Sequence, residues 1–153
     1  VDYQAGNLHL WNDFRPSDHD VSGEVRCRYQ NHLPSFEVKV GTTSLRLLLD
    51  TGCSELVMDK QVLNKTRCLV SDLTENELMG AGGKRSHALT GTLNHLEVGD
   101  IRLEQLPVTF SDLSRLKEPL GDFDGIIGYP LLAKVRTVVC WERKRLYLLK
   151  GGN

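Results

Sequence analysis

Short apolar runs with a period of two residues recur along most of the chain, and glycine-containing turns separate them. In the clearest case Phe36, Val38 and Val40 alternate with polar residues, and a second run at 45–49 follows a break at 41–43. A period of two is typical of β-strands that bury one face, so these two runs predict a hairpin. The second run ends where the polar segment beginning at Asp50 starts.

Two later segments predict further hairpins. In the first of them, Pro107 cannot donate a hydrogen bond to a neighbouring strand, which moves its strand toward the edge of a sheet. The second lies near the end of the sequence, across a charged turn. The strands of these hairpins cover residues 87–98 with 101–110, and residues 137–141 with 146–149.

Short helices complete the predicted elements. Asp59 can cap a helix that carries Val62, and Pro130 suits the first turn of another. Many short strands with one or two short helices predict an all-β fold, either a barrel or a sandwich. Residues 1–23 are polar and lack a sustained apolar period, so we expect an N-terminal arm followed by one domain over residues 24–150.

Composition and charge limit the partners of this chain. It has 153 residues, of which 40% are hydrophobic and 25% are charged, as expected of one soluble globular domain. Lysine and arginine number 19 against 20 aspartates and glutamates, a balance that produces no strong field toward nucleic acid or an anionic membrane. No apolar run approaches the roughly 20 residues of a membrane helix. We therefore expect neither nucleic-acid binding nor membrane insertion.

The cellular location is weakly constrained by the sequence. The chain begins at Val1 rather than at methionine, which indicates processing or truncation. The triplet Asn64-Lys65-Thr66 permits N-glycosylation if the protein is secreted by a eukaryote. An exported location, periplasmic or extracellular, is slightly favoured over a cytoplasmic one.

Four cysteines, Cys27, Cys53, Cys68 and Cys140, lack the spacing of a metal-binding motif. The chain is long enough to fold without disulfides, so buried free thiols are expected. A zinc site built from Cys27, His32 and Cys68 would need a fourth ligand at no recognisable spacing, and the five histidines are not clustered. We therefore expect no metal and no cofactor.

An apolar strand runs directly into Asp50-Thr51-Gly52, which places a carboxylate at the border of a buried strand. An aspartate is rarely buried unless it is paired or hydrogen-bonded. Thr51 can donate a hydroxyl hydrogen bond, and Gly52 allows another backbone to approach closely. The pattern predicts a rigid loop that presents a carboxylate, and an aspartate that merely caps a turn is the alternative.

The sequence around this loop resembles the retropepsin-like aspartic peptidases, in particular bacterial retropepsin-like domains and the aspartyl protease domains of gag polyproteins. The resemblance extends over about residues 25–149. Three motifs carry it: the apolar run into Asp50-Thr51-Gly52 with Ser54 and Leu56-Val57-Met58, the segment from Asp124 through Ile126-Ile127-Gly128 to Leu132, and the closing segment Arg143 to Leu148.

The resemblance implies a closed, single-lobe β-barrel and a set of site residues. A glycine-rich segment stands where the family places a flap over bound peptide, although a flexible turn would have the same composition. The implied residues are Asp50 as the catalytic acid, Thr51, Gly52 and Cys53 in the active-site loop, Met79, Gly80, Ala81, Gly82 and Gly83 in the flap, and Ile126, Ile127 and Gly128 packed beside the loop.

The number of Asp-Thr-Gly loops in the sequence implies that a second copy of the chain is needed. The sequence contains one Asp-Thr-Gly and no second copy of the motif, and 153 residues are too few for a two-lobed enzyme. A homodimer would bring Asp50 from each protomer to the twofold axis. In aspartic proteases two carboxylates about 3 Å apart share a proton, which yields a bell-shaped dependence of activity on pH.

The resemblance thus implies an aspartic endopeptidase acting on a protein or peptide substrate. The alternative is a catalytically silent retropepsin-like module that binds peptides or dimerises a larger protein. A metallopeptidase is a poor third choice.

The sequence departs from the family pattern at Cys53 and at Tyr129-Pro130. Cys53 stands where alanine or serine is commoner, and a small buried residue is favoured over a thiol that senses oxidation. Tyr129-Pro130 replaces the Arg-Asn or Arg-Asp of viral members, so it removes an arginine that ties their dimers together. Asp124 belongs to the packing motif, and no catalytic role is assigned to it.

Overall fold

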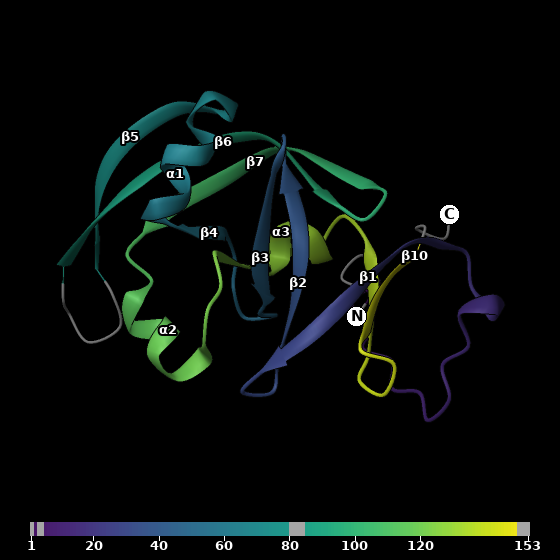
Figure 1. Cartoon of the computed structure of the whole chain (residues 1–153). Coiled ribbons are helices and arrows are strands. Elements are labelled where there is room, and N and C mark those ends of the chain that lie inside the picture. The colour runs from purple at the N-terminus through teal and green to yellow at the C-terminus, as the bar shows by residue number, and fades with distance from the viewer. Residues whose placement is uncertain (1, 3–4, 80–84, 150–153) are drawn as a thin grey trace.

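The computed structural model describes residues 2, 5–79 and 85–149. Within these ranges ten strands and three short α-helices follow one another, with 3₁₀ turns at Pro16–Asp18 and Arg67–Leu69 (Figure 1). The strands are β1 (Val21–Gln30), β2 (Leu33–Val40), β3 (Thr43–Leu49), β4 (Leu56–Asp59), β5 (Val70–Met79), β6 (Arg85–Val98), β7 (Ile101–Ser111), β8 (Gly125–Ile127), β9 (Arg136–Cys140) and β10 (Arg145–Leu149), and the helices are α1 (Lys60–Thr66), α2 (Ser114–Leu120) and α3 (Tyr129–Leu132).

Six of the strands close into a barrel. The strands are hydrogen-bonded in the order β5-β6-β7-β4-β8-β3-β2-β1-β10-β9, and a further pairing joins β6 to β2. That closing contact is the pair Lys39 and Glu97. The barrel therefore contains β6, β7, β4, β8, β3 and β2, which confirms the predicted all-β closed barrel. The sequence predicted one or two short helices, and α2 is the additional one.

The three predicted hairpins are present as β2–β3, β6–β7 and β9–β10. The prediction that Pro107 places its strand at an edge is wrong, because β7 lies between β6 and β4. The pairing of β7 with β4 begins at Val108, so Pro107 does not have to donate a hydrogen bond to β4.

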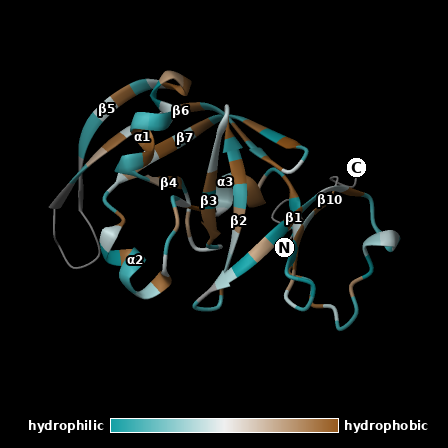
Figure 2. Ribbon diagram, viewed as in Figure 1, coloured by the Kyte–Doolittle hydropathy of each residue, from teal (hydrophilic) through white to brown (hydrophobic). Residues whose placement is uncertain are grey.

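The barrel interior holds the main apolar core. Figure 2 shows hydrophobic residues along β3 and α3 in the middle of the molecule. Phe36, Leu47, Met58, Phe110 and Ile127 have no exposed surface there. Burial at roughly 25 cal/mol per Å² of apolar surface makes this cluster the main source of stability, so the strand that leads to Asp50 is anchored by the best-packed part of the chain.

Different parts of the chain form the two ends of the molecule. The N-terminal arm and the β9–β10 hairpin lie side by side at one end, and β5 and α1 lie at the other (Figure 1). A small separate cluster under the arm contains Phe14, Val138, Tyr147 and Leu149.

Of the helices described, none is long and apolar enough to cross a lipid bilayer.

Asp59 joins α1 to α2 and offers a test of local stability. Its side chain is buried, accepts the Gln61 N–H at 2.9 Å as the N-cap of α1, and lies 2.7 Å from Lys117 Nζ. We expect Asp59→Ala to lower the free energy of unfolding by about 2 kcal/mol, because the helix loses its cap and the half-buried Lys117 loses its partner. Urea titration measures this change.

The control for this prediction is Asp112→Ala. Asp112 also accepts a backbone N–H, from Ser114 at 2.9 Å, but it is exposed. Its replacement is expected to cost clearly less than that of Asp59. Equal losses in the two variants would contradict the role assigned to the buried contact with Lys117.

Candidate active site

Asp50 follows the last residue of β3 and begins a tight turn. Its N–H donates to the Ile127 carbonyl at 3.1 Å, and its own carbonyl accepts the Cys53 N–H at 3.0 Å. The Gly52 N–H donates to Asp50 Oδ1 at 2.9 Å, which orients the carboxylate. The sequence led us to expect a buried carboxylate, but in the single protomer Asp50 is exposed, because burial ends at Leu49. The acid is therefore held in a fixed turn and presented at the surface.

Strand β8 supports this turn from the side. It lies parallel to β3, with Leu49 opposite Ile127, and antiparallel to β4, with Val57 opposite Ile126. The strands that enter and leave the Asp50 turn are thus both hydrogen-bonded to β8. The structure brings the predicted packing residues Ile126, Ile127 and Gly128 against the loop.

Gly128 allows the closest of these contacts. A Cβ atom at this position would lie 2.1 Å from the Asp50 carbonyl oxygen and 2.4 Å from the Cys53 carbonyl oxygen. The next residue, Tyr129, donates its N–H to that Cys53 oxygen at 2.8 Å. Any side chain at position 128 would therefore push the loop away from β8.

Asp124 has a structural function at the other end of β8. Its Oδ2 accepts the Arg46 N–H at 2.8 Å, and its N–H donates to the Arg46 carbonyl at 2.7 Å. Its carbonyl accepts the Asp59 N–H at 2.8 Å. The carboxylate is thus used to tie β8 to β3, which agrees with its exclusion from the predicted catalytic residues.

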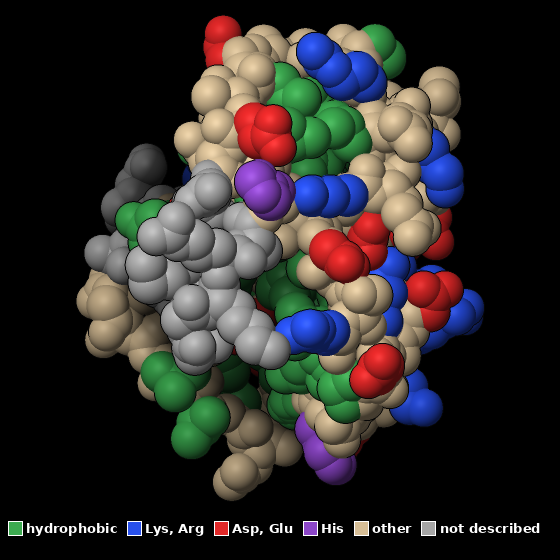
Figure 3. Space-filling view, turned by 90° about the vertical axis from the view of Figure 1, so that its left-hand side faces the viewer, with side chains coloured by type: hydrophobic (Ala, Val, Ile, Leu, Met, Phe, Trp, Pro, Cys, Tyr) green, Lys and Arg blue, Asp and Glu red, His purple; other side chains and the backbone are tan. Residues whose placement is uncertain are grey.

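The predicted flap falls only partly within the described residues. Met79 is the last residue of β5, opposite Arg85 of β6. Gly80, Ala81, Gly82 and Gly83 lie outside the described residues. Figure 3 views this end of the molecule and shows apolar side chains in a hollow, with basic and acidic side chains beside it.

Comparison with known families decides the classification. A family model described as aspartyl protease matches residues 36–131, which is more than half of the chain. The chain belongs to the aspartyl protease family. The matched region begins in β2 and ends in α3, so it includes the Asp50 loop and the β8 strand of this aspartyl protease domain.

Solved structures agree with this classification at the level of the fold. A retropepsin-like aspartic protease from Rickettsia conorii is similar with a TM-score of 0.58 and 20% identity, over 82% of this chain and 89% of that one. The EIAV protease in complex with the inhibitor HBY-793 gives a TM-score of 0.49 and 16% identity, over 67% and 86%. No curated protein matches the chain. The similarity to the Rickettsia conorii structure shows that this aspartyl protease domain has the retropepsin-like fold.

A groove beside the loop was not anticipated from the sequence. Glu55, two residues beyond Cys53, accepts a hydrogen bond from Thr109 Oγ1 at 2.9 Å and so connects the end of the loop to β7. In the sequence, the one feature that could have indicated this groove is the charged residue Glu55 just after the loop. The groove has a volume of about 550 Å³ and is lined by Ser54, Glu55, Thr90, Gly91, Gln105, Leu106, Pro107, Val108, Thr109, Tyr129, Pro130 and Lys134.

All four cysteines are unpaired, and one of them belongs to the loop. Cys27 is buried as expected, but Cys53 and Cys140 are half-buried and Cys68 is exposed. Burial raises the pKa of the Cys53 thiol, a hydrogen bond with the backbone of Glu55 opposes this, and the negative charge of Asp50 raises it further. Within the described ranges, no three His, Cys, Asp or Glu residues are grouped so that they could hold a metal.

These environments predict an order of alkylation. Burial raises the pKa of Cys27 to about 11 from 9.0, so at neutral pH its reactive thiolate is about 100-fold rarer than in an unperturbed thiol. We expect iodoacetamide to modify exposed Cys68 first, Cys53 more slowly and Cys27 only after unfolding. Peptide mass spectrometry of timed samples gives the order. Modification of Cys53 before Cys68 would show that the loop thiol is activated instead.

Proposed function

We propose that the protein is an aspartic endopeptidase that works as a homodimer, with Asp50 of each protomer acting on one water molecule. The observation that carries this proposal is the position of Asp50. In a chain of the aspartyl protease family, this acid is exposed on a turn whose backbone is tied to Ile127 and whose carboxylate is oriented by Gly52.

The need for a second copy follows from the chemistry. Water must lose a proton while the amide carbonyl is polarised, and one carboxyl group cannot do both at once. These 153 residues contain a single Asp-Thr-Gly, which supports our proposal that the second carboxyl group is Asp50 of another protomer. An exposed Asp50 supports this proposal, because a carboxylate covered by its own chain could not approach its partner.

In the proposed reaction, the ionised Asp50 takes a proton from water as the water oxygen bonds to the amide carbon. The protonated Asp50 of the other protomer gives its proton to the carbonyl oxygen, which becomes a hydroxyl in the tetrahedral intermediate. The carbon–nitrogen bond then breaks as the first Asp50 passes the proton it took from water to the leaving nitrogen, and the hydroxyl returns its proton to the second Asp50 as the new carboxylic acid forms. The Gly52 N–H holds one carboxylate oxygen in place throughout.

The substrate we propose is an extended peptide. Main-chain hydrogen bonds would hold it between the loop (Thr51, Gly52 and Cys53) and the segment from Met79 to Gly83, which we propose as the flap. The apolar part of the groove beside Glu55 supports this proposal, because it offers space for a substrate side chain. The exported location of the protein stays a prediction.

Cleavage of a mixed peptide library tests the proposal. We expect specific activity to rise with protein concentration until the dimer is saturated, and a transition-state mimic of aspartic peptidases to abolish it. Mass spectrometry of the products identifies the cleaved bonds. A protein that binds library peptides at acid and neutral pH without cutting any of them would instead be the silent module.

A further inference from the structure

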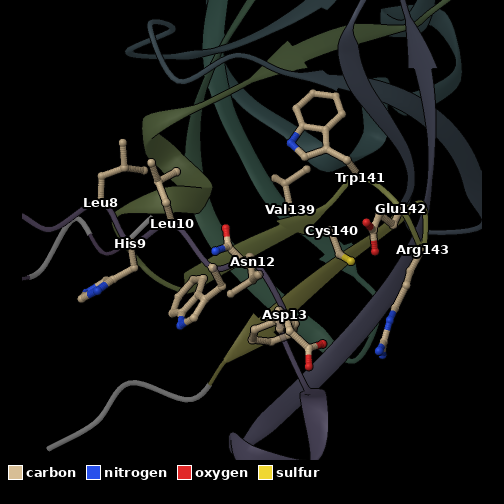
Figure 4. Close-up of a pocket in the computed structure, with 13 residues that line it drawn as sticks. Leu8, His9, Leu10, Asn12, Asp13, Val139, Cys140, Trp141, Glu142 and Arg143 are labelled. Carbon is tan, nitrogen blue, oxygen red and sulfur yellow. The ribbon is translucent and has the colours of Figure 1, made fainter.

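Two large hollows lie on the surface of the described chain, and only one of these two adjoins the Asp50 loop. The first, of about 440 Å³, lies between the arm and the β9–β10 turn, where Figure 4 shows Leu10 on one side and Trp141 on the other. No residue of the Asp50 loop lines it. The second is the groove of about 550 Å³ whose lining begins with Ser54 and Glu55, directly after the loop. We call it the Glu55 groove.

The walls of the Glu55 groove are held in place by the fold. The Tyr129 N–H donates to the Cys53 carbonyl at 2.8 Å, which fixes the start of α3 beside the loop. Strand β4, which follows the loop, lies parallel to β7 and is hydrogen-bonded to it. Lys134 Nζ donates to the Glu104 carbonyl at 3.2 Å and so connects the segment after α3 to β7. A side chain that enters the groove therefore meets a preformed surface, which lowers the entropic cost of binding.

Stiff rings form the apolar part of this surface. Pro107 and Tyr129 are exposed in the groove, and Pro130 is half-buried beside them. Rings of this kind pack well against the methylene stem of a long side chain, and the face of a tyrosine ring attracts a cation. The groove thus has room and suitable contacts for a long side chain with an aliphatic stem.

Glu55 supplies a negative charge at the loop end of the groove. Its Oε2 accepts a hydrogen bond from Thr109 Oγ1 at 2.9 Å, which orients the carboxylate but, because the hydroxyl is neutral, does not balance its charge. Among the described residues that line the groove, Lys134 is the only cation, and its ammonium group donates to a backbone carbonyl. The salt bridges of the described residues do not include Glu55.

A second carboxylate adds to this negative charge. Asp50 and Glu55 both raise the pKa of the Cys53 thiol, so the charges of both reach the residue that lies between them in the loop. An acidic substrate side chain in the groove would therefore be repelled, and a basic one would be attracted.

The loss of water from Glu55 also favours a basic side chain over an apolar one. A substrate side chain that fills the groove removes water from the carboxylate, and a carboxylate without a compensating partner is strongly unfavourable. An apolar side chain offers no such partner. A lysine or arginine replaces the lost hydrogen bonds by a charge-assisted one, while its stem lies on the rings of Pro107 and Tyr129.

We propose that the Glu55 groove selects peptides that carry a lysine or arginine a few residues from the cleaved bond, and that Glu55 is the residue that determines this specificity. The basic side chain extends along the groove and donates to Oε1 of Glu55, the carboxylate oxygen that Thr109 does not use. The inference rests on the proposed peptidase and names the class of peptide that it cuts.

Matched peptides test the inference. Lysine, or norleucine, which keeps the stem and lacks the ammonium group, is placed in turn at each position of the library peptides. We expect one position at which lysine raises kcat/KM over norleucine by at least about tenfold, the scale of one charge-assisted hydrogen bond. Glu55→Gln keeps an acceptor for Thr109 and should remove this preference. Glu55→Lys should reverse it, so that glutamate is favoured at that position.

Glu142→Gln is the matched control. Glu142 is an exposed glutamate that lines the hollow of Figure 4, so its replacement changes the net charge of the protein equally but away from the loop. The ratio of kcat/KM for lysine and norleucine peptides should equal that of the wild type. An equal shift of this ratio in the Glu55 and Glu142 variants would show a general effect of net charge and overturn the role of Glu55.

Binding to Asp50→Asn separates this inference from the proposed function. Fluorescence anisotropy of labelled lysine and norleucine peptides gives their dissociation constants without cleavage. If the wild type cuts no peptide, but Asp50→Asn binds the lysine peptide more tightly and the added Glu55→Gln abolishes the difference, the specificity of the groove stands and the peptidase proposal fails. If the wild type cuts both peptides equally at every position, the groove inference fails and the peptidase stands. Peptides that are neither cut nor bound overturn both.

Discussion

Asp50→Asn is expected to reduce peptide cleavage by at least about 10³-fold, the scale of a lost general base. The asparagine has nearly the same shape, and its side-chain oxygen can still accept the Gly52 N–H that Asp50 Oδ1 accepts at 2.9 Å. The fold and the association of protomers should therefore persist. What is lost is the group that takes the proton from water, in both protomers at once.

The measurement compares initial cleavage rates of wild type and variant on the same peptides across the pH range. Asp100→Asn is a matched control, because Asp100 is an exposed aspartate in the turn between β6 and β7. Its activity should equal that of the wild type. Equal turnover by the Asp50 variant would remove the basis of the proposed mechanism, whatever the classification of the fold.

Gly128→Ala is expected to cause the largest loss of stability of any single methyl addition near the site. The new Cβ would lie 2.1 Å from the Asp50 carbonyl oxygen and 2.4 Å from the Cys53 carbonyl oxygen, and both are backbone atoms that cannot rotate away. We expect a loss of roughly 3 kcal/mol in the free energy of unfolding, at the upper end for overpacked sites. Cleavage should also fall, because the loop must move away from β8.

Gly52→Ala provides the comparison within the same loop. At that position the nearest atom to a new Cβ is Asp50 Oδ1 at 3.3 Å, which belongs to a side chain that can adjust. Thermal and urea unfolding should show a small change for Gly52→Ala and a large one for Gly128→Ala. Equal effects would mean that the contact between β8 and the loop is looser than the distances indicate.

The sequence predicted the features that depend on local patterns. Alternating apolar residues gave β2, β3 and the long β6–β7 hairpin, and Asp59 gave the cap of α1, because each depends on neighbours within a few residues. The position of Asp50 after the buried β3 was also predictable. The contact between this loop and residues 126–128 was indicated only by resemblance to a family, since no local rule links segments so far apart.

The features that were missed depend on tertiary contacts. Helix α2 was not predicted, because it is polar and contains Pro119, and its position is fixed through Lys117 and Asp59. The exposure of Asp50 was missed, since an apolar run shows that a strand is buried but not where its last side chain points. The arm was predicted to be irregular, and nothing in its composition indicated that Leu8, Leu10 and Phe14 would flank a pocket with β9.

The hydrogen bond between Arg46 and Asp124 joins residues that are 78 positions apart in the chain, and this separation affects biosynthesis. At typical translation rates, the ribosome adds those residues on the order of 10 s after Asp50 has been made. During that interval the nascent polypeptide contains the acid but lacks the strand that holds its turn. The turn that carries Asp50 therefore gains its contacts with β8 only after nearly the whole domain has emerged.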